Sequence, residues 1–78
     1  MLKIKKYKKL EYNLINDNES DIIYLEIQDE NGHPLGEIKK NILGDIEVIL
    51  YKQNNHIAVR LKELECLISL AKEKINST

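Results

Sequence analysis

This chain has 78 residues, which is the length of one domain. Its 12 basic and 13 acidic side chains leave a formal net charge of −1, so no global field favours nucleic acid or an anionic membrane. The 42% hydrophobic and 32% charged content is typical of a folded soluble domain. A chain this short buries only about 60% of the surface of its unfolded form, which argues against a deep substrate cleft.

Cysteine usage and the length of apolar runs indicate the cellular compartment. The one cysteine, Cys66, cannot form an internal disulfide, and this favours a reducing environment. No apolar run approaches the roughly 18 residues that span a bilayer, and the basic start has no apolar segment behind it. We therefore expect a cytoplasmic protein with no membrane contact. Lysine (11), isoleucine (12) and asparagine (8) outnumber the single arginine, a coding bias typical of AT-rich bacterial, phage or plasmid genes.

The chain opens with a lysine-rich segment, residues 1–8. We expect either a short strand through Leu2 and Ile4 or a mobile basic arm. Beyond it, apolar and polar residues alternate in four segments, and the alternation predicts half-buried strands. With one less regular segment at 34–40, the predicted strands are 9–16, 21–28, 34–40, 45–52 and 56–60. Asn, Asp and Gly clusters separate them, which predicts short turns and antiparallel hairpins.

The alternation also predicts which side chains face the core. The expected inward sets are Leu10, Tyr12 and Leu14; Ile23, Leu25 and Ile27; Ile46, Val48 and Leu50; and Ile57, Val59 and Leu61. The segment 34–40 carries Lys39 and Lys40, which discourage unwanted pairing, so we expect it at an edge of the sheet.

The last eighteen residues, 61–78, form the longest periodic segment. Leu61, Leu64, Ile68, Ala71 and Ile75 recur at spacings of three and four, which predicts an amphipathic helix. A sheet with one apolar face needs a cover, and this helix is the element able to supply it. The predicted fold class is therefore α+β: one domain over 1–78, with a four- to five-stranded antiparallel meander and a C-terminal helix packed on one face.

No motif in the sequence predicts catalysis or a metal site. The two histidines and Cys66 lack ligand spacing, and neither a nucleophile elbow nor a phosphate-binding loop is present. Asp29-Glu30-Asn31-Gly32 lacks the offsets of a calcium loop and is expected to be a plain turn. We therefore predict a protein that is not an enzyme and that carries no cofactor or metal.

Three surfaces are candidates for binding. The first is the outer sheet face, where Tyr24, Ile49, Tyr51 and Arg60 are predicted beside Glu26 and Glu47; aromatic side chains are enriched at interface centres, although cross-strand pairing alone also explains them. The second is the back of the helix, where Cys66 and Leu70 lie roughly 160° and 120° from the stripe centre at Leu64, with Leu67 at its edge. Cys66 and Leu70 either pack under a loop or against the N-terminal arm, or they form a helix-mediated homodimer contact.

The third surface is the basic N-terminus. Its lysines and tyrosine are suited to tracking a phosphate backbone while the ring stacks on a base. The residues concerned are Lys3, Lys5, Lys6, Tyr7, Lys8 and Lys9. A local patch on a neutral protein equally describes a solvated arm or a steering surface for an acidic partner.

The leading hypothesis is a small non-enzymatic interaction protein. It binds and regulates or inhibits a macromolecule, most readily a protein, and the coding bias suggests an accessory product of a phage or mobile element. The first alternative is a nucleic-acid-binding regulator that uses the lysine-rich N-terminus. The second is a small-ligand-binding domain whose site forms between subunits.

Overall fold

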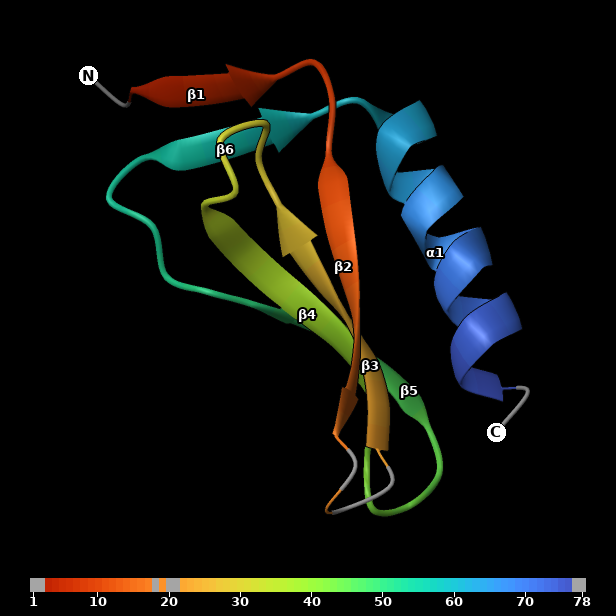
Figure 1. Cartoon of the computed structure of the whole chain (residues 1–78). Helices are drawn as coiled ribbons and strands as arrows, with labels where there is room; N and C mark the ends of the chain where they lie inside the picture. The colour runs from red at the N-terminus through yellow and green to blue at the C-terminus, as the bar shows by residue number, and fades with distance from the viewer. Residues whose placement is uncertain (1–2, 18, 20–21, 77–78) are drawn as a thin grey trace.

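The computed structural model describes residues 3–17, 19 and 22–76. The strands in chain order are β1 (Ile4–Tyr7), β2 (Glu11–Asp17), β3 (Ile22–Gln28), β4 (Pro34–Lys40), β5 (Ile46–Leu50) and β6 (His56–Val59), and one helix follows, α1 (Leu61–Asn76). β2 to β5 form an antiparallel sheet in chain order, and α1 lies along one of its faces (Figure 1). The predicted α+β class and the covering helix are confirmed.

The segment predicted as the fifth strand of the meander does not join it. β6 instead pairs in parallel with β1, with Ile4 opposite His56 and Tyr7 opposite Val59. This small sheet lies across one end of the larger one (Figure 1). Of the two expectations for the N-terminal segment, the short strand is therefore correct from Ile4 on, and Leu2 lies outside the described residues. Tyr7 and Val59 pack against the core, which ties the two sheets together.

The edge assignment of 34–40 is wrong. In the order β2-β3-β4-β5, β4 is an interior strand, and its Leu35 and Ile38 are among the most buried side chains described. Gly36 lies within β4, which runs between β3 and β5, and a Cβ at this position would be 2.5 Å from the carbonyl oxygen of Ile49. Close backbone approach therefore accounts for glycine at this position. The exposed edges of the sheet belong to β2 and β5.

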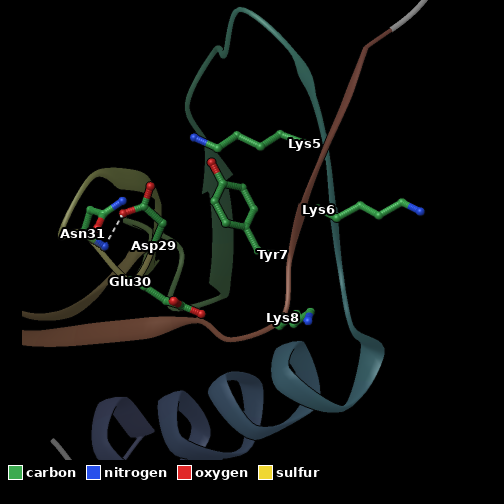
Figure 2. A pocket seen from close by; sticks show the side chains of 7 residues that line it. All are labelled: Lys5, Lys6, Tyr7, Lys8, Asp29, Glu30 and Asn31. Atoms are coloured by element: carbon green, nitrogen blue, oxygen red, sulfur yellow. Dashed lines mark hydrogen bonds between the residues drawn. The ribbon is translucent and has the colours of Figure 1, made fainter.

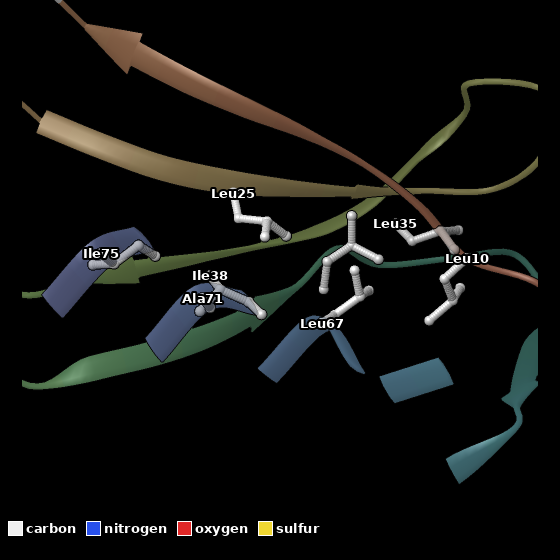
Figure 3. Packing of buried hydrophobic residues seen from close by; sticks show 8 residues of the cluster. Leu10, Leu25, Leu35, Ile38, Leu67, Ala71 and Ile75 are labelled. Carbon is white, nitrogen blue, oxygen red and sulfur yellow. The ribbon is translucent and has the colours of Figure 1, made fainter. Parts of the chain in front are cut away.

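The core lies between α1 and the two central strands, because α1 packs against β3 and β4. A helix is about 10 Å wide, whereas four strands extend about 14 Å, so one helix cannot cover the whole sheet. The inward-facing side chains of the edge strands consequently stay exposed. The prediction that they belong to the core is therefore wrong for Tyr12, Leu14, Val48 and Leu50. The buried cluster is drawn in Figure 3 and comprises Leu10, Leu25, Ile27, Leu35, Ile38, Leu67, Ala71 and Ile75.

The buried face of α1 is rotated from the predicted stripe. Leu67, at the predicted edge of the stripe, is buried, whereas Leu61 is 68% exposed. Leu64 and Ile68, predicted near the centre, are half-buried. The carbonyl of Arg60 accepts the N–H groups of Glu63 and Leu64, so Leu61 belongs to the first turn of the helix.

Candidate protein-binding surfaces of the sheet

The outer face of the four-stranded sheet is the face opposite α1. It displays the side chains that alternate with the core residues, and these include Tyr24 on β3, Glu37 on β4 and Ile49 on β5, with Tyr51 just beyond β5. The Tyr51 N–H donates to the carbonyl of Leu35 at 3.0 Å, which continues the pairing of β5 with β4 and fixes Tyr51 on this face. Three predicted residues, Tyr24, Ile49 and Tyr51, are therefore on one surface.

The hydroxyl of Tyr51 lies in an acidic environment. Burial, followed by the negative charges of Glu37 and Glu26, raises the pKa of Tyr51 above its ordinary value of 10.0. The hydroxyl donates a hydrogen bond to Glu37, and Tyr24 is close enough to contribute to the same shift. Tyr51 is therefore neutral at physiological pH, and its hydroxyl reaches from the edge strand to Glu37 on β4.

Two carboxylates stand directly opposite each other on this face. Glu26 on β3 pairs with Glu37 on β4, and like charges at such positions destabilise a sheet. Each has a neighbour on its own strand: Gln28 Nε2 donates to Glu26 Oε1 at 2.8 Å, and Lys39 Nζ lies 3.3 Å from Glu37 Oε1. The single lysine offsets only part of the charge, so this face keeps an acidic centre next to two tyrosine rings.

Arg60 was predicted on the same face, and its position there is wrong. It follows β6 and precedes α1, and its carbonyl accepts the first hydrogen bonds of the helix. The strand that leads to it belongs to the small parallel sheet, so its alternation does not continue the outer face. The exposed Arg60 side chain is therefore separate from the tyrosines.

The back of the helix differs from a continuous apolar patch. Cys66 is exposed with a free thiol, whereas Leu70 is half-buried and packs against the core cluster. A shallow depression there is lined by Cys66, Leu70 and four polar residues, Lys62, Glu65, Ser69 and Glu73. Leu70 thus packs within the chain, against the core cluster, and the helix-mediated homodimer contact stays a prediction.

The basic N-terminus is organised as a strand, but its aromatic ring is occupied. Lys5 and Tyr7 share one face of β1, with Lys5 Nζ 5.3 Å from the ring centre, and Tyr7 packs on the core. Figure 2 shows Lys6 pointing away from Lys5 and the acidic residues Asp29 and Glu30 near the tyrosine. These residues line one pocket of about 320 Å³ together with Lys8 and Asn31.

Mixed charge weakens the nucleic-acid alternative. Asp29 and Glu30 share the pocket with the lysines and repel phosphate, and Lys9 Nζ lies 3.4 Å from Glu11 Oε1. Lys3 is exposed ahead of β1. The ring of Tyr7 is also half-buried, and its contacts with Lys5 and the core leave less of it open for stacking on a base. The arrangement gives no specific support to nucleic-acid binding, which stays a prediction.

Asp29 is a structural carboxylate in the β3–β4 turn. Its Oδ1 accepts the N–H groups of Asn31 and His33, each at 2.9 Å, and the residue is buried. The bond from His33, opposed by burial and aided by the bond from Asn31 and the charges of His33 and Lys5, lowers the pKa of Asp29 below 3.8. Gly32, with φ of 81°, lets the chain close this turn.

The pH dependence of stability tests the role of Asp29. Because its pKa is lowered on folding, its contribution is complete above the ordinary carboxyl pKa and is lost as pH falls through the folded value. We expect the urea midpoint of the wild type to fall as the pH is lowered from the ordinary carboxyl range toward the lower folded pKa of Asp29. Asp29→Asn keeps an acceptor oxygen without the charge and should flatten this fall; an identical pH profile would contradict the assignment. Asp45→Asn, at an exposed turn position, is the control.

Strand β5 forms a further surface that the sequence did not reveal. It is an edge strand, and Val48, Ile49 and Leu50 are exposed together with Ile42 and Leu43 in the preceding turn. Asn41 Oδ1 accepts the N–H groups of Leu43 and Asp45, and this turn leaves the two apolar side chains at its tip in solvent. Geometry alone could have indicated exposed apolar side chains on an edge strand, because one helix is narrower than a sheet of four strands.

Within the described residues, no group of three or more His, Cys, Asp or Glu side chains is placed to hold a metal ion. The one described helix is neither long nor apolar enough to cross a membrane. Comparison of the chain with family models, with curated proteins and with solved structures found no match. The geometry of the surfaces is therefore the basis for a functional proposal.

Proposed function

We propose that this chain is a small non-enzymatic interaction protein that binds a partner protein through its outer sheet face and thereby regulates or inhibits it. The observation that carries the proposal is the pairing of Glu26 with Glu37 beside Tyr51 and Tyr24. A like-charge pair costs stability in the free domain, and a cation from a partner removes that cost.

The chemistry of this face suggests the kind of partner it takes. A lysine or arginine side chain that enters between the carboxylates gains charge-assisted hydrogen bonds, and arginine does so with a bidentate geometry. Tyr51 and Tyr24 offer rigid rings that bury apolar area at a low entropy cost and attract a cation to their faces. The favoured partner surface is therefore basic, with an exposed arginine or lysine at its centre.

Partner binding can be tested with a face-specific set of variants. Immobilised wild-type protein is used to retain partners from lysates of low-GC bacteria, and a retained protein is then purified for titration. Tyr51→Ala should weaken its binding by about 30-fold or more, as truncation of a central interface aromatic does. Ser69→Ala, on the exposed back of α1, is the matched control and should leave the affinity unchanged.

Two further measurements separate this face from other surfaces. Glu26→Gln combined with Glu37→Gln should weaken binding and reduce its dependence on salt, because the cation then meets no net charge. Circular dichroism verifies that each variant is folded. A partner that binds the Tyr51 and glutamate variants as tightly as the wild type would exclude the outer face as its site.

A further inference from the structure

Apart from one charged side chain, Glu47, the edge at β5 lacks the features that usually protect an edge strand. Natural sheets shield their edges with lysine, proline, bulges or a covering element. β5 has the sequence Ile-Glu-Val-Ile-Leu, pairs with β4 without a register shift, and contains neither lysine nor proline. Val48 is 47% and Leu50 67% exposed. An edge of this composition is a template for another strand.

The backbone pairing shows which groups the edge offers. In an antiparallel pair, residues alternate between those bonded to the neighbour and those whose N–H and C=O point away. Asn41 donates to the carbonyl of Asp45 at 2.7 Å and Tyr51 donates to the carbonyl of Leu35 at 3.0 Å. The odd-numbered residues of β5 therefore bond to β4, and Ile46, Val48 and Leu50 direct their backbone groups to the open edge.

This pattern is complementary to itself. We propose that two copies of this chain pair antiparallel through β5 about a two-fold axis at Val48, joining their four-stranded sheets into one of eight strands. In this register Val48 faces Val48 of the second copy, and Ile46 faces Leu50. All three residues then use both outward backbone groups, and each cross-strand pair on the helix side of the sheet is apolar.

Charge favours this register over its neighbours. Glu47 is the one charged residue of β5, and the Val48-centred pairing places it opposite Ile49 of the second copy. A two-fold axis at Glu47 also matches the backbone groups, but it sets the two Glu47 side chains directly opposite each other, which is destabilising. An axis at Ile49 avoids that contact and leaves Ile46 without a partner inside β5. Pairing at Val48 thus gives full overlap with no like-charge contact.

The side of β5 that faces α1 is only partly covered. Beside the strand runs a groove of about 360 Å³ between α1 and β5, lined by Ile46, Val48, Ile68 and Ala71 among others. Pairing brings the same groove of the second copy alongside, so the exposed apolar side chains of the two β5 strands cover one another. Stable interfaces bury roughly 1,200–2,000 Å², and a seam of five residues on each chain buries less than that. We therefore expect a reversible, concentration-dependent dimer.

The proposal goes beyond the function proposed above and does not depend on it. The outer face carrying Tyr51 stays open in the dimer, which then presents two copies of that face on a continuous sheet. The seam also differs from the helix contact predicted through Cys66 and Leu70. A variant that removes the dimer and keeps partner binding therefore separates the two proposals.

Analytical ultracentrifugation over a concentration series tests the seam. The wild type should show a monomer–dimer equilibrium, and Val48→Lys should weaken the dimer at least about 100-fold, because two ammonium groups then meet at the axis. Leu14→Lys is the matched control: Leu14 lies on the same side of the sheet, on the opposite edge strand, and is 44% exposed. It should dimerise as the wild type does.

A cross-link gives an independent readout that does not rely on destabilisation. Directly opposed, hydrogen-bonded residues have Cα atoms about 5.5 Å apart, which is within the range that a disulfide spans. In a Cys66→Ser background, Val48→Cys should form a disulfide-linked dimer under mild oxidation, and Leu14→Cys should not. A wild type that stays monomeric at its highest soluble concentration would overturn the proposal, as would a dimer broken by Leu14→Lys or by Cys66→Lys but not by Val48→Lys.

Discussion

Leu25→Ala is expected to lower the free energy of unfolding by about 2–5 kcal/mol. Leu25 is 0% exposed at the middle of β3, between two neighbouring strands and under α1 (Figure 3). Removing its branched side chain takes away apolar burial and leaves a cavity that the paired backbone cannot close. A domain of this length has a total stability of about 4–12 kcal/mol, so this one change threatens the folded state.

Leu14 provides a matched control for that experiment. It lies directly opposite Leu25 on β2, on the same side of the sheet, and is 44% exposed. Leu14→Ala should therefore cost less than about 1 kcal/mol, measured by urea denaturation of both variants. Equal losses at the two positions would show that α1 does not divide the sheet into a covered centre and exposed edges.

The local elements of this fold follow from the sequence because each leaves a periodic trace. Alternation of Ile23, Leu25 and Ile27 with polar residues placed β3 correctly, and the Asn, Asp and Gly clusters marked the hairpin turns. Even the irregular segment at 34–40 has the predicted bounds. Short-range patterns and turn chemistry were sufficient to determine strand positions, the antiparallel meander and the covering helix.

Strand order was harder to predict, because it depends on contacts between distant segments. β6 pairs with β1, which begins more than fifty positions earlier, and no local pattern encodes that parallel pairing. The lysines of 34–40 suggested an edge, but Lys39 forms an ion pair with Glu37 on the outer face and β4 is interior. Once the order is known, the exposed apolar residues of β5 identify it as an unprotected edge.

The candidate binding face was predicted in part. Tyr24, Ile49 and Tyr51 lie on the outer face, as the alternation of β3 and β5 indicated. Glu37 was missed, because its contact with Tyr51 arises only from the pairing of β4 with both neighbours. Arg60 was misplaced for the same reason, because the strand before it, β6, pairs with β1 and is not part of the four-stranded sheet. A surface assembled from several strands needs their register, which one sequence does not supply.

Leu67→Ala should produce the second large loss, about 2–5 kcal/mol in the free energy of unfolding. Leu67 is 4% exposed and projects from α1 toward the side chains of Leu35 and Leu10 (Figure 3). Leu10 is itself held near the helix, since its N–H donates to Glu63 Oε1 at 3.2 Å. Truncation at Leu67 therefore opens a cavity where the helix start, β2 and β4 meet.

Leu61 on the same helix is the discriminating control. The sequence pattern alone assigns Leu61 to the buried stripe and Leu67 to its margin, whereas in the structure Leu61 is 68% exposed. Leu61→Ala should therefore change the free energy of unfolding, measured by urea denaturation, by less than about 0.5 kcal/mol, because alanine is also a good helix former. The reverse ranking, with Leu61→Ala the costlier variant, would mean that α1 is rotated back to the face that its leucine periodicity suggests. The two substitutions together thus measure the orientation of the helix on the sheet.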